Sequence, residues 1–144
     1  MAQSVTKVSY YILGSESVED RIRFAIKFVR QSWRRGMDVH CHVSSQVEAK
    51  ELDHLMWEDG ESFVPHEVEQ GVLSRAPVGI GWQDPSSRDD LFVNLGGKLP
   101  AWFSHFNHLI EIVVQNPKIL ETTRANWKQL KFNGYPITKH DLRS

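Results

Sequence analysis

Hydrophobic and polar positions follow a strand period and then a helix period at the start of the chain. The β-branched and aromatic run of residues 8–13 ends at Gly14 and predicts a strand. A helix is expected next, because Ser17 and Asp20 resemble a capping box and Gly36 supplies a stop. Apolar side chains recur between them at helical spacing, at Ile22, Ala25, Ile26, Val29 and Trp33. One face of this helix is therefore expected to pack on a sheet.

The same order of strand and helix repeats in the next segment. Residues 38–43 predict a second strand, and Ser45 with Glu48 forms another capping-box pattern that opens a helix. The apolar positions of that helix are Val47, Leu52, Leu55 and Met56. Strands that alternate with helices over short connections favour a parallel sheet with right-handed crossovers. Residues 77–82 and 90–95 are expected to continue this sheet.

Two further helices are predicted at the end of the chain, over residues 100–115 and 117–134. Each begins with proline, which is favoured in the first helical turn, and a glycine closes the second. Glycine, proline, serine and aspartate concentrate in residues 66–76 and 83–89, which are expected to be loops. The whole pattern predicts a three-layer α/β fold with a mostly parallel sheet and helices on both faces.

Composition restricts this prediction to one soluble domain. A chain of 144 residues suits a single domain, here residues 1–144, and 40% hydrophobic with 24% charged residues is ordinary for a folded protein. The single Cys41 cannot form an internal disulfide, and the N-terminus leads into a strand-like run rather than a signal core. No apolar run approaches the ~20 residues that cross a bilayer. A cytoplasmic protein with no membrane contact is expected.

Charge is distributed unevenly along the chain. Residues 117–144 contain six basic and two acidic residues, a net charge of +4, which leaves −5 for residues 1–116 within the total of −1. A total near zero argues against wholesale coating of nucleic acid. The positive C-terminal segment is therefore the place to look for an anionic partner.

Enzyme signatures are weak in this sequence. The first strand-to-helix turn reads GSES, with one glycine and no Gly-x-Gly-x-x-Gly, and no Walker loop is present, so no nucleotide cofactor is expected. His40 and His42 share a strand face, and His105 and His108 share a face of the predicted 100–115 helix. Either pair could serve a metal-dependent or cofactor-free hydrolase, which stays open as an alternative. No carboxylate or cysteine set completes a zinc pattern, so structural or surface histidines are favoured.

A basic stripe is predicted on the last helix. Arg124, Lys128 and Lys131 fall at i, i+4 and i+7, so they share one face. Beside them lie the apolar Leu120, Trp127 and Leu130. The stripe is either a solvated face next to a core-facing one, or a docking groove for an acidic peptide with an apolar anchor. Direct binding of single-stranded DNA through Trp127, Lys128 and Lys131 is a third possibility, against which the −5 balance of residues 1–116 argues.

Large apolar residues also occur where no regular element is predicted. The segment LMWEDGESFVPHEV places Phe63, Val64 and Pro65 after Trp57 and a short acidic turn. These side chains either cover the core or face a partner.

Several segments together resemble a known family. YYIL, LMWEDGESFVPH, APVGIGW, RDDLFVNL and RANWKQLKFNGYPI occur in an order and spacing similar to those of the chi subunit of the bacterial DNA polymerase III holoenzyme. The resemblance extends over nearly the whole chain, and SFVPH with the preceding Leu-x-Trp is its most specific part.

This resemblance implies a Rossmann-like domain without nucleotide chemistry or any other cofactor, which acts as a non-catalytic adaptor. One face would bind the psi subunit and thereby reach the clamp loader, through Trp57, Phe63, Val64 and Pro65. A separate groove would bind the acidic C-terminal tail of single-stranded DNA-binding protein, so that DNA is reached only indirectly. The residues implied for this tail site are Arg124, Trp127, Lys128, Lys131, Gly134 and Ile137.

The sequence departs from the family pattern at two places. The loop before the fourth predicted strand, often basic in relatives, reads QDPSSRDD with Arg88 as its one cation, which argues against direct DNA contact there. Relatives often carry a basic residue one turn before Arg124, where this chain has Leu120. The groove is therefore expected to bind its peptide more weakly or to depend more on Lys118.

Overall fold

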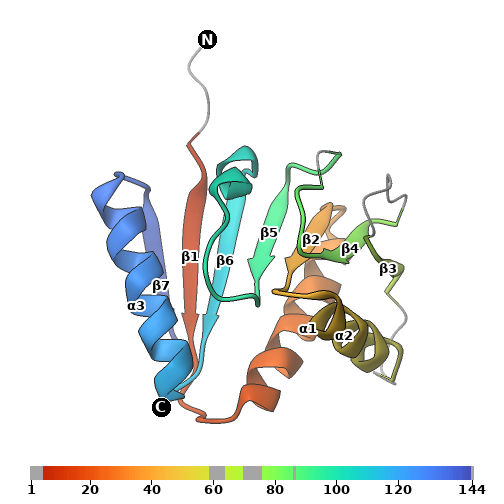
Figure 1. The fold of residues 1–144 in the computed structure, drawn as a ribbon, viewed down its shortest axis with the longest axis horizontal. Helices are drawn as coiled ribbons and strands as arrows, with labels where there is room; N and C mark the ends of the chain where they lie inside the picture. The colour runs from red at the N-terminus through yellow and green to blue at the C-terminus, as the bar shows by residue number, and fades with distance from the viewer. Residues whose placement is uncertain (1–4, 59–63, 70–75, 86, 144) are drawn as a thin grey trace.

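A seven-stranded parallel sheet organises the domain, with three helices packed on it (Figure 1). The computed structural model describes residues 5–58, 64–69, 76–85 and 87–143. The strands are β1 (Lys7–Ile12), β2 (Val39–His42), β3 (His66–Val68), β4 (Val78–Gly81), β5 (Leu91–Asn94), β6 (His108–Val113) and β7 (Ile137–Asp141). The helices are α1 (Val18–Arg34), α2 (Gln46–Glu58), the 3₁₀ helix η1 (Ala101–His105) and α3 (Pro117–Phe132).

The spatial order of the strands is β3-β4-β2-β5-β6-β1-β7, and every paired strand is parallel to its neighbour. Parallel sheets are normally covered on both faces. One core contains α1 and α2 side chains with one face of the sheet, and a second core contains η1 and α3 side chains with the other. The predicted three-layer α/β class is confirmed. No helix in the described ranges is long and apolar enough to cross a membrane.

The helix boundaries follow the predicted local signals. The Ser17 side chain accepts a hydrogen bond from the Asp20 amide at the start of α1, and Gly36 after its end has a φ of 82°. The Asn116 side chain accepts from two amides of the first turn of α3, where proline holds the first position. Gly134, with a φ of 80°, turns the chain toward β7.

The predicted helix over residues 100–115 is wrong. Pro100 opens only the short η1, and residues 108–113 form β6, between β5 and β1 in the middle of the sheet. From Leu109 to Val113 every residue is buried, so the strand shows no alternation of apolar and polar positions. Every position of this segment except Glu111 is apolar, and such a pattern fits a helix and a central strand equally well.

Two further strands were not predicted. β3 occupies three residues of the expected loop 66–76, and β7 lies at the edge of the sheet beside β1. The sequence of β7 is ITKHD, which is polar as edge strands often are, and it therefore carries little strand signal.

Candidate functional site

A pocket of about 350 Å³ opens beside α3. The strands β1 and β6 contribute Tyr10, Ile12 and Val113 to its lining. The helix contributes Leu120, Thr123, Arg124 and Trp127. The C-terminal segment adds Lys139 and Arg143, so that apolar surface and three cations, Arg124, Lys139 and Arg143, border one space. Such a combination suits a ligand that has both an apolar group and negative charge.

Trp127 is the central side chain of this pocket. Its ring lies edge-to-face against Tyr10, with ring centroids 5.2 Å apart. Lys139 Nζ lies 4.5 Å and Lys131 Nζ 6.0 Å from the centroid of the indole ring. Cations within about 6 Å of an aromatic face are attracted by its quadrupole. Trp127 is therefore held between the sheet and two cations, in a half-buried position.

The basic stripe of α3 faces solvent. Arg124, Lys128 and Lys131 are exposed, whereas Asn126 and Leu130 are the buried residues of the same helix. Within the described ranges no carboxylate lies within ion-pair distance of any of the three cations. They are therefore available to an acidic partner.

The structure brings only part of the predicted tail site together. Arg124 and Trp127 border the pocket, while Lys128 lies on the exposed side of α3 outside its lining. Ile137 is half-buried and packs with the core on the α3 side, and Gly134 lies exposed in the turn before it. Sequence reasoning did not place Tyr10, Lys139 and Arg143 at this site, nor the further lining residues Ile12, Val113, Gln115 and Thr123. Lys139 and Arg143 were visible in the sequence only as part of the positive charge of residues 117–144.

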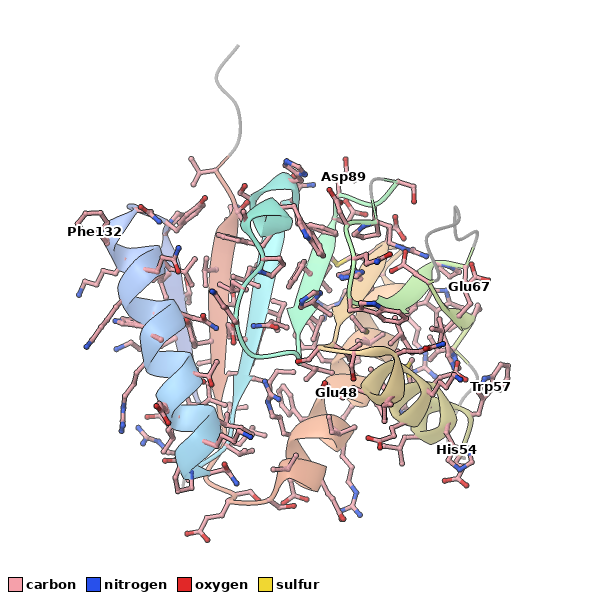
Figure 2. All side chains as sticks on the ribbon, in the orientation of Figure 1. Glu48, His54, Trp57, Glu67, Asp89 and Phe132 are labelled. Carbon is pink, nitrogen blue, oxygen red and sulfur yellow. The ribbon has the colours of Figure 1, made fainter. Side chains whose placement is uncertain are left out.

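The predicted partner face around Trp57 is only partly exposed. The Trp57 side chain, at the end of α2, is 56% exposed and packs on the ring of His66, with centroids 4.8 Å apart. His66 is buried, donates from Nδ1 to the carbonyl of Val64 over 2.6 Å, and places Nε2 3.2 Å from an Asp53 carboxylate oxygen. Figure 2 shows Trp57 at one end of the molecule and Phe132, at the end of α3, at the other. The two candidate surfaces are therefore well separated.

The other members of this predicted face differ from one another. Val64 is only 4% exposed and belongs to the core that includes Leu52 and Met56 of α2, so the expectation of a partner-facing Val64 side chain is wrong. The physical reason is that Val64 lies two residues before β3, which packs beside α2, so this apolar side chain is part of the core between them. Pro65 is half-buried. Phe63 lies outside the described residues.

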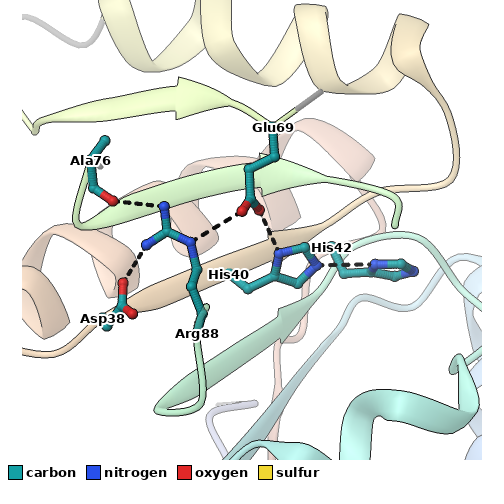
Figure 3. Close-up of polar contacts among 6 residues, drawn as sticks. All are labelled: Asp38, His40, His42, Glu69, Ala76 and Arg88. Atoms are coloured by element: carbon teal, nitrogen blue, oxygen red, sulfur yellow. Dashed lines mark hydrogen bonds and ion pairs between the residues drawn. The ribbon is translucent and has the colours of Figure 1, made fainter. Parts of the chain in front are cut away.

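A second charged group is buried at the other half of the sheet (Figure 3). His40 Nδ1 lies 2.9 Å from Glu69 Oε1, and Arg88 Nε donates to Glu69 Oε2 over 3.2 Å. The Arg88 guanidinium also donates to the Asp38 carboxylate and to the carbonyl of Ala76. Arg88 is 4% exposed, so the one cation of the predicted 83–89 loop is occupied by internal partners. This arrangement leaves no guanidinium at that loop for a phosphate.

The paired histidines of β2 belong to this buried group. His40 Nε2 lies 3.3 Å from His42 Nδ1, which fits a neutral His42 that donates to a neutral His40. Burial lowers the pKa of His40, and burial together with the neighbouring His40 lowers the pKa of His42 to about 3. Cys41 points into the opposite core, where burial raises the pKa of its thiol to about 12. These groups are structural at neutral pH.

The expected pairing of His105 and His108 on a helix is also wrong. His105 is exposed on η1, whereas His108 is on β6 and lies 2.7 Å from the Ser9 hydroxyl. In the part of the chain that the structure describes, no three histidine, cysteine or carboxylate side chains are grouped as a metal site would require.

The crevice at the carboxyl ends of β5 and β6, where Rossmann-type folds bind nucleotides, is bordered by a buried polar cluster. Asn94 Nδ2 donates to Glu111 Oε1 over 2.7 Å, and Arg21 donates to the carbonyls of Ile112 and Asn94. Burial raises the pKa of Glu111 to about 7, although Asn94 and Arg21 oppose this shift. The polar groups are thus bonded within the protein.

Fold and site together define a parallel α/β domain that carries a pocket with apolar and cationic lining. Comparison with known proteins gives the family. The model of the family "DNA polymerase III chi subunit, HolC" matches residues 5–138. The chain is 31% identical over 140 residues to DNA polymerase III subunit chi of Pseudomonas aeruginosa, covering 96% of this chain and 98% of that protein. It is 26% identical over 137 residues to subunit chi of Haemophilus influenzae, covering 92% and 95% respectively. The chain belongs to the DNA polymerase III chi subunit family and is a non-catalytic accessory subunit of that holoenzyme.

Proposed function

We propose that this subunit is an adaptor that binds the acidic C-terminal tail of single-stranded DNA-binding protein in the pocket beside α3. The single observation that carries the proposal is Trp127, half-buried over an apolar lining and flanked by Arg124, Lys131 and Lys139. The pocket would bury an apolar group of the tail, while the cations would pair with its carboxylates. DNA would then be reached only through the bound protein.

The test is calorimetric titration with a synthetic acidic peptide that ends in phenylalanine, with a single-stranded oligonucleotide in a parallel titration. Arg124→Ala and Lys128→Ala should each weaken peptide binding by about 1 kcal/mol, or roughly fivefold, because a charge-assisted contact of ~1.5–3 kcal/mol is reduced by solvent screening. Lys27→Ala is the matched control, since this lysine is exposed on α1, on the opposite face of the sheet.

Peptide affinity that is unchanged in both α3 variants would remove the tail assignment. Oligonucleotide binding that is as tight as peptide binding, and lost in the same variants, would favour the direct DNA-binding alternative. A melting curve for each variant separates loss of binding from loss of fold.

We further propose that Trp57, Phe63 and Pro65 face the psi subunit, which would link this cytoplasmic adaptor to the clamp loader. The exposed indole of Trp57 supports this proposal, because large aromatic side chains are enriched at the centres of protein interfaces. Trp57→Ala and Phe63→Ala should each reduce association with psi by ~2 kcal/mol and leave the melting temperature of the free subunit nearly unchanged.

Val64→Ala supplies the opposite control. Its side chain is in the core, so the variant should lower the free energy of unfolding while the association surface keeps its side chains. A Phe63→Ala variant that is destabilised alone and still copurifies with psi would place the psi surface elsewhere.

A further inference from the structure

The C-terminal edge strand β7 begins inside the part of the chain that the family model matches and ends beyond it. That match ends at residue 138, whereas β7 continues to Asp141. β7 pairs in parallel with β1, and the register places Lys139 opposite Tyr10. Leu142 continues the attachment, because its amide donates to the carbonyl of Ile12 over 2.8 Å. The segment after residue 138 is thus fixed beside the pocket.

Strand alternation directs Lys139 toward α3. Ile137 packs in the core on the α3 side, and residues two apart in a strand point to the same face. Lys139 accordingly lies over Trp127, with Nζ 4.5 Å from the ring centroid. His140 points to the other face, where its ring stacks on Tyr11 with centroids 4.5 Å apart. The position of Lys139 therefore follows from the pairing of β7 with β1.

Arg143 already holds a carboxylate in the geometry that an acidic ligand would need. Its Nε and one terminal nitrogen donate to the two oxygens of Asp141 over 2.9 and 2.7 Å, and its backbone amide donates to the same carboxylate over 3.1 Å. Both side chains are 50% exposed, and Arg143 borders the pocket. These hydrogen bonds lower the pKa of Asp141 to about 2, so it is ionised in this arrangement.

The α3 side of the pocket has only one cation in its lining. Arg124 is that cation, and Leu120, one turn earlier, presents an apolar side chain. Lys139 and Arg143 are the other two cations of the lining. Most of the positive charge that borders the pocket thus comes from the edge strand and the residues that follow it.

We propose that Lys139 and Arg143 form the second half of the acidic-peptide site, opposite Arg124, and that the Asp141 carboxylate competes with the peptide for Arg143. The inference rests on the proposed function of the pocket. It assigns recognition of peptide carboxylates to two elements, α3 and β7, instead of to the helix alone. It also makes the internal Arg143–Asp141 pair a determinant of affinity.

The experiment measures dissociation constants of the full-length subunit for an acidic, phenylalanine-terminated peptide at low salt. Lys139→Ala and Arg143→Ala should each weaken binding about two- to fivefold, the range of exposed charge pairs. Asp141→Asn should tighten binding by about twofold, because it frees Arg143 and removes a like charge from the path of the ligand. The same peptide with asparagine in place of aspartate should lose these differences between variants.

Further variants separate charge from folding. Lys139→Arg keeps the cation and should keep the affinity, and the melting temperature of each variant reports whether β7 remains paired. Arg124→Ala is measured alongside. If Arg124→Ala weakens binding while Lys139→Ala and Arg143→Ala do not, the inference is overturned and the proposed function stands. If Asp141→Asn leaves the affinity unchanged, the competition is overturned. If the parent protein does not bind the peptide, the proposed function itself fails.

Discussion

The molecule contains two groups of charged side chains with opposite surroundings. At the β2–β4 half of the sheet, Arg88 is 4% exposed and bonds to two carboxylates and a carbonyl. At the other half, Arg124 is exposed on α3 beside an open pocket, and in the described ranges it has no carboxylate within ion-pair distance. The same residue type is thus bonded within the fold in one place and left exposed beside a pocket in the other. The difference is set by whether carboxylates are already within reach.

The Arg143–Asp141 pair lies between these two cases. It is an internal pair like that of Arg88, yet it is half exposed and borders the pocket. An exposed pair contributes little to stability, whereas breaking a buried pair leaves an uncompensated charge. Internal pairing alone therefore does not exclude a binding role, and burial decides which role a pair can have.

The largest expected effect comes from breaking the buried group. Arg88→Met removes the cation and leaves the Glu69 side chain, which is 9% exposed, beside the neutral His40. Loss of one partner of a buried pair costs about 3–5 kcal/mol. Denaturant unfolding should show this loss. Arg124→Met is the matched control and should stay within about 0.5 kcal/mol of the parent, because its side chain is exposed.

Two outcomes would contradict this contrast. Equal stability of the two variants would mean that Arg88 is not a structural cation. A peptide affinity that falls in Arg88→Met at unchanged stability would mean that the buried group takes part in binding.

The next effect depends on pH and concerns Glu111. Burial raises the pKa of this carboxyl group from 4.5 to about 7, with Arg21, Asn94 and Asn126 around it. The folded protein keeps the proton where the unfolded chain has lost it, so this group lowers stability as the pH rises from 4.5 to about 7. Glu111→Gln cannot ionise. It should therefore gain stability relative to the parent across this window, by on the order of 3 kcal/mol above neutrality.

Unfolding free energies measured over a pH series test this prediction. Glu121 is exposed on α3, so Glu121→Gln serves as the control for the loss of one carboxyl group. A difference between Glu111→Gln and the parent that stays constant over the whole series would show that Glu111 is ionised in the folded state.

Caps, stop residues and hydrophobic periodicity were sufficient to predict four of the strands and the three α-helices. β1, β2, β4 and β5 lie within a residue or so of the expected runs, and the three α-helices have the expected caps or stops. β6 was mistaken for a helix because it is buried on both faces and apolar at nearly every position, and β7 was missed because it is polar at an edge. The hydrophobic pattern of a segment reflects how buried it is more than which element it forms. A fully buried strand such as β6 therefore has the pattern of a buried helix, and an exposed edge strand such as β7 has the composition of a loop.

At the candidate site too, only the residues that share one predicted element could be placed together from the sequence. Arg124 and Trp127 are one turn apart on α3, so their proximity follows from helical spacing alone. Tyr10 and Lys139 come together only through the register of β1 with β7, which spans almost the whole chain. Without β7 in the prediction, no periodicity could place Lys139 or Arg143 beside Trp127. Val64 was expected to face a partner because proline and turn residues flank it in the sequence, but it lies two residues before the unpredicted β3 and packs in the core.

The smallest expected effect is that of salt, and it compares the two charged groups in one protein. The Debye length falls from about 10 Å at 0.1 M salt to about 3 Å at 1 M, and buried pairs are screened much less than exposed ones. Raising the salt from about 0.05 M to about 0.5 M should therefore weaken peptide binding a few-fold, or on the order of 1 kcal/mol. Binding should not vanish, because burial of an apolar group against Trp127 is not screened.

Over the same range of salt, the stability difference between Arg88→Met and the parent should change by less than about 0.5 kcal/mol, since the partners of Arg88 are internal. Peptide affinity that does not respond to salt would make the exposed cations bystanders, and complete loss of binding would make the contact purely electrostatic.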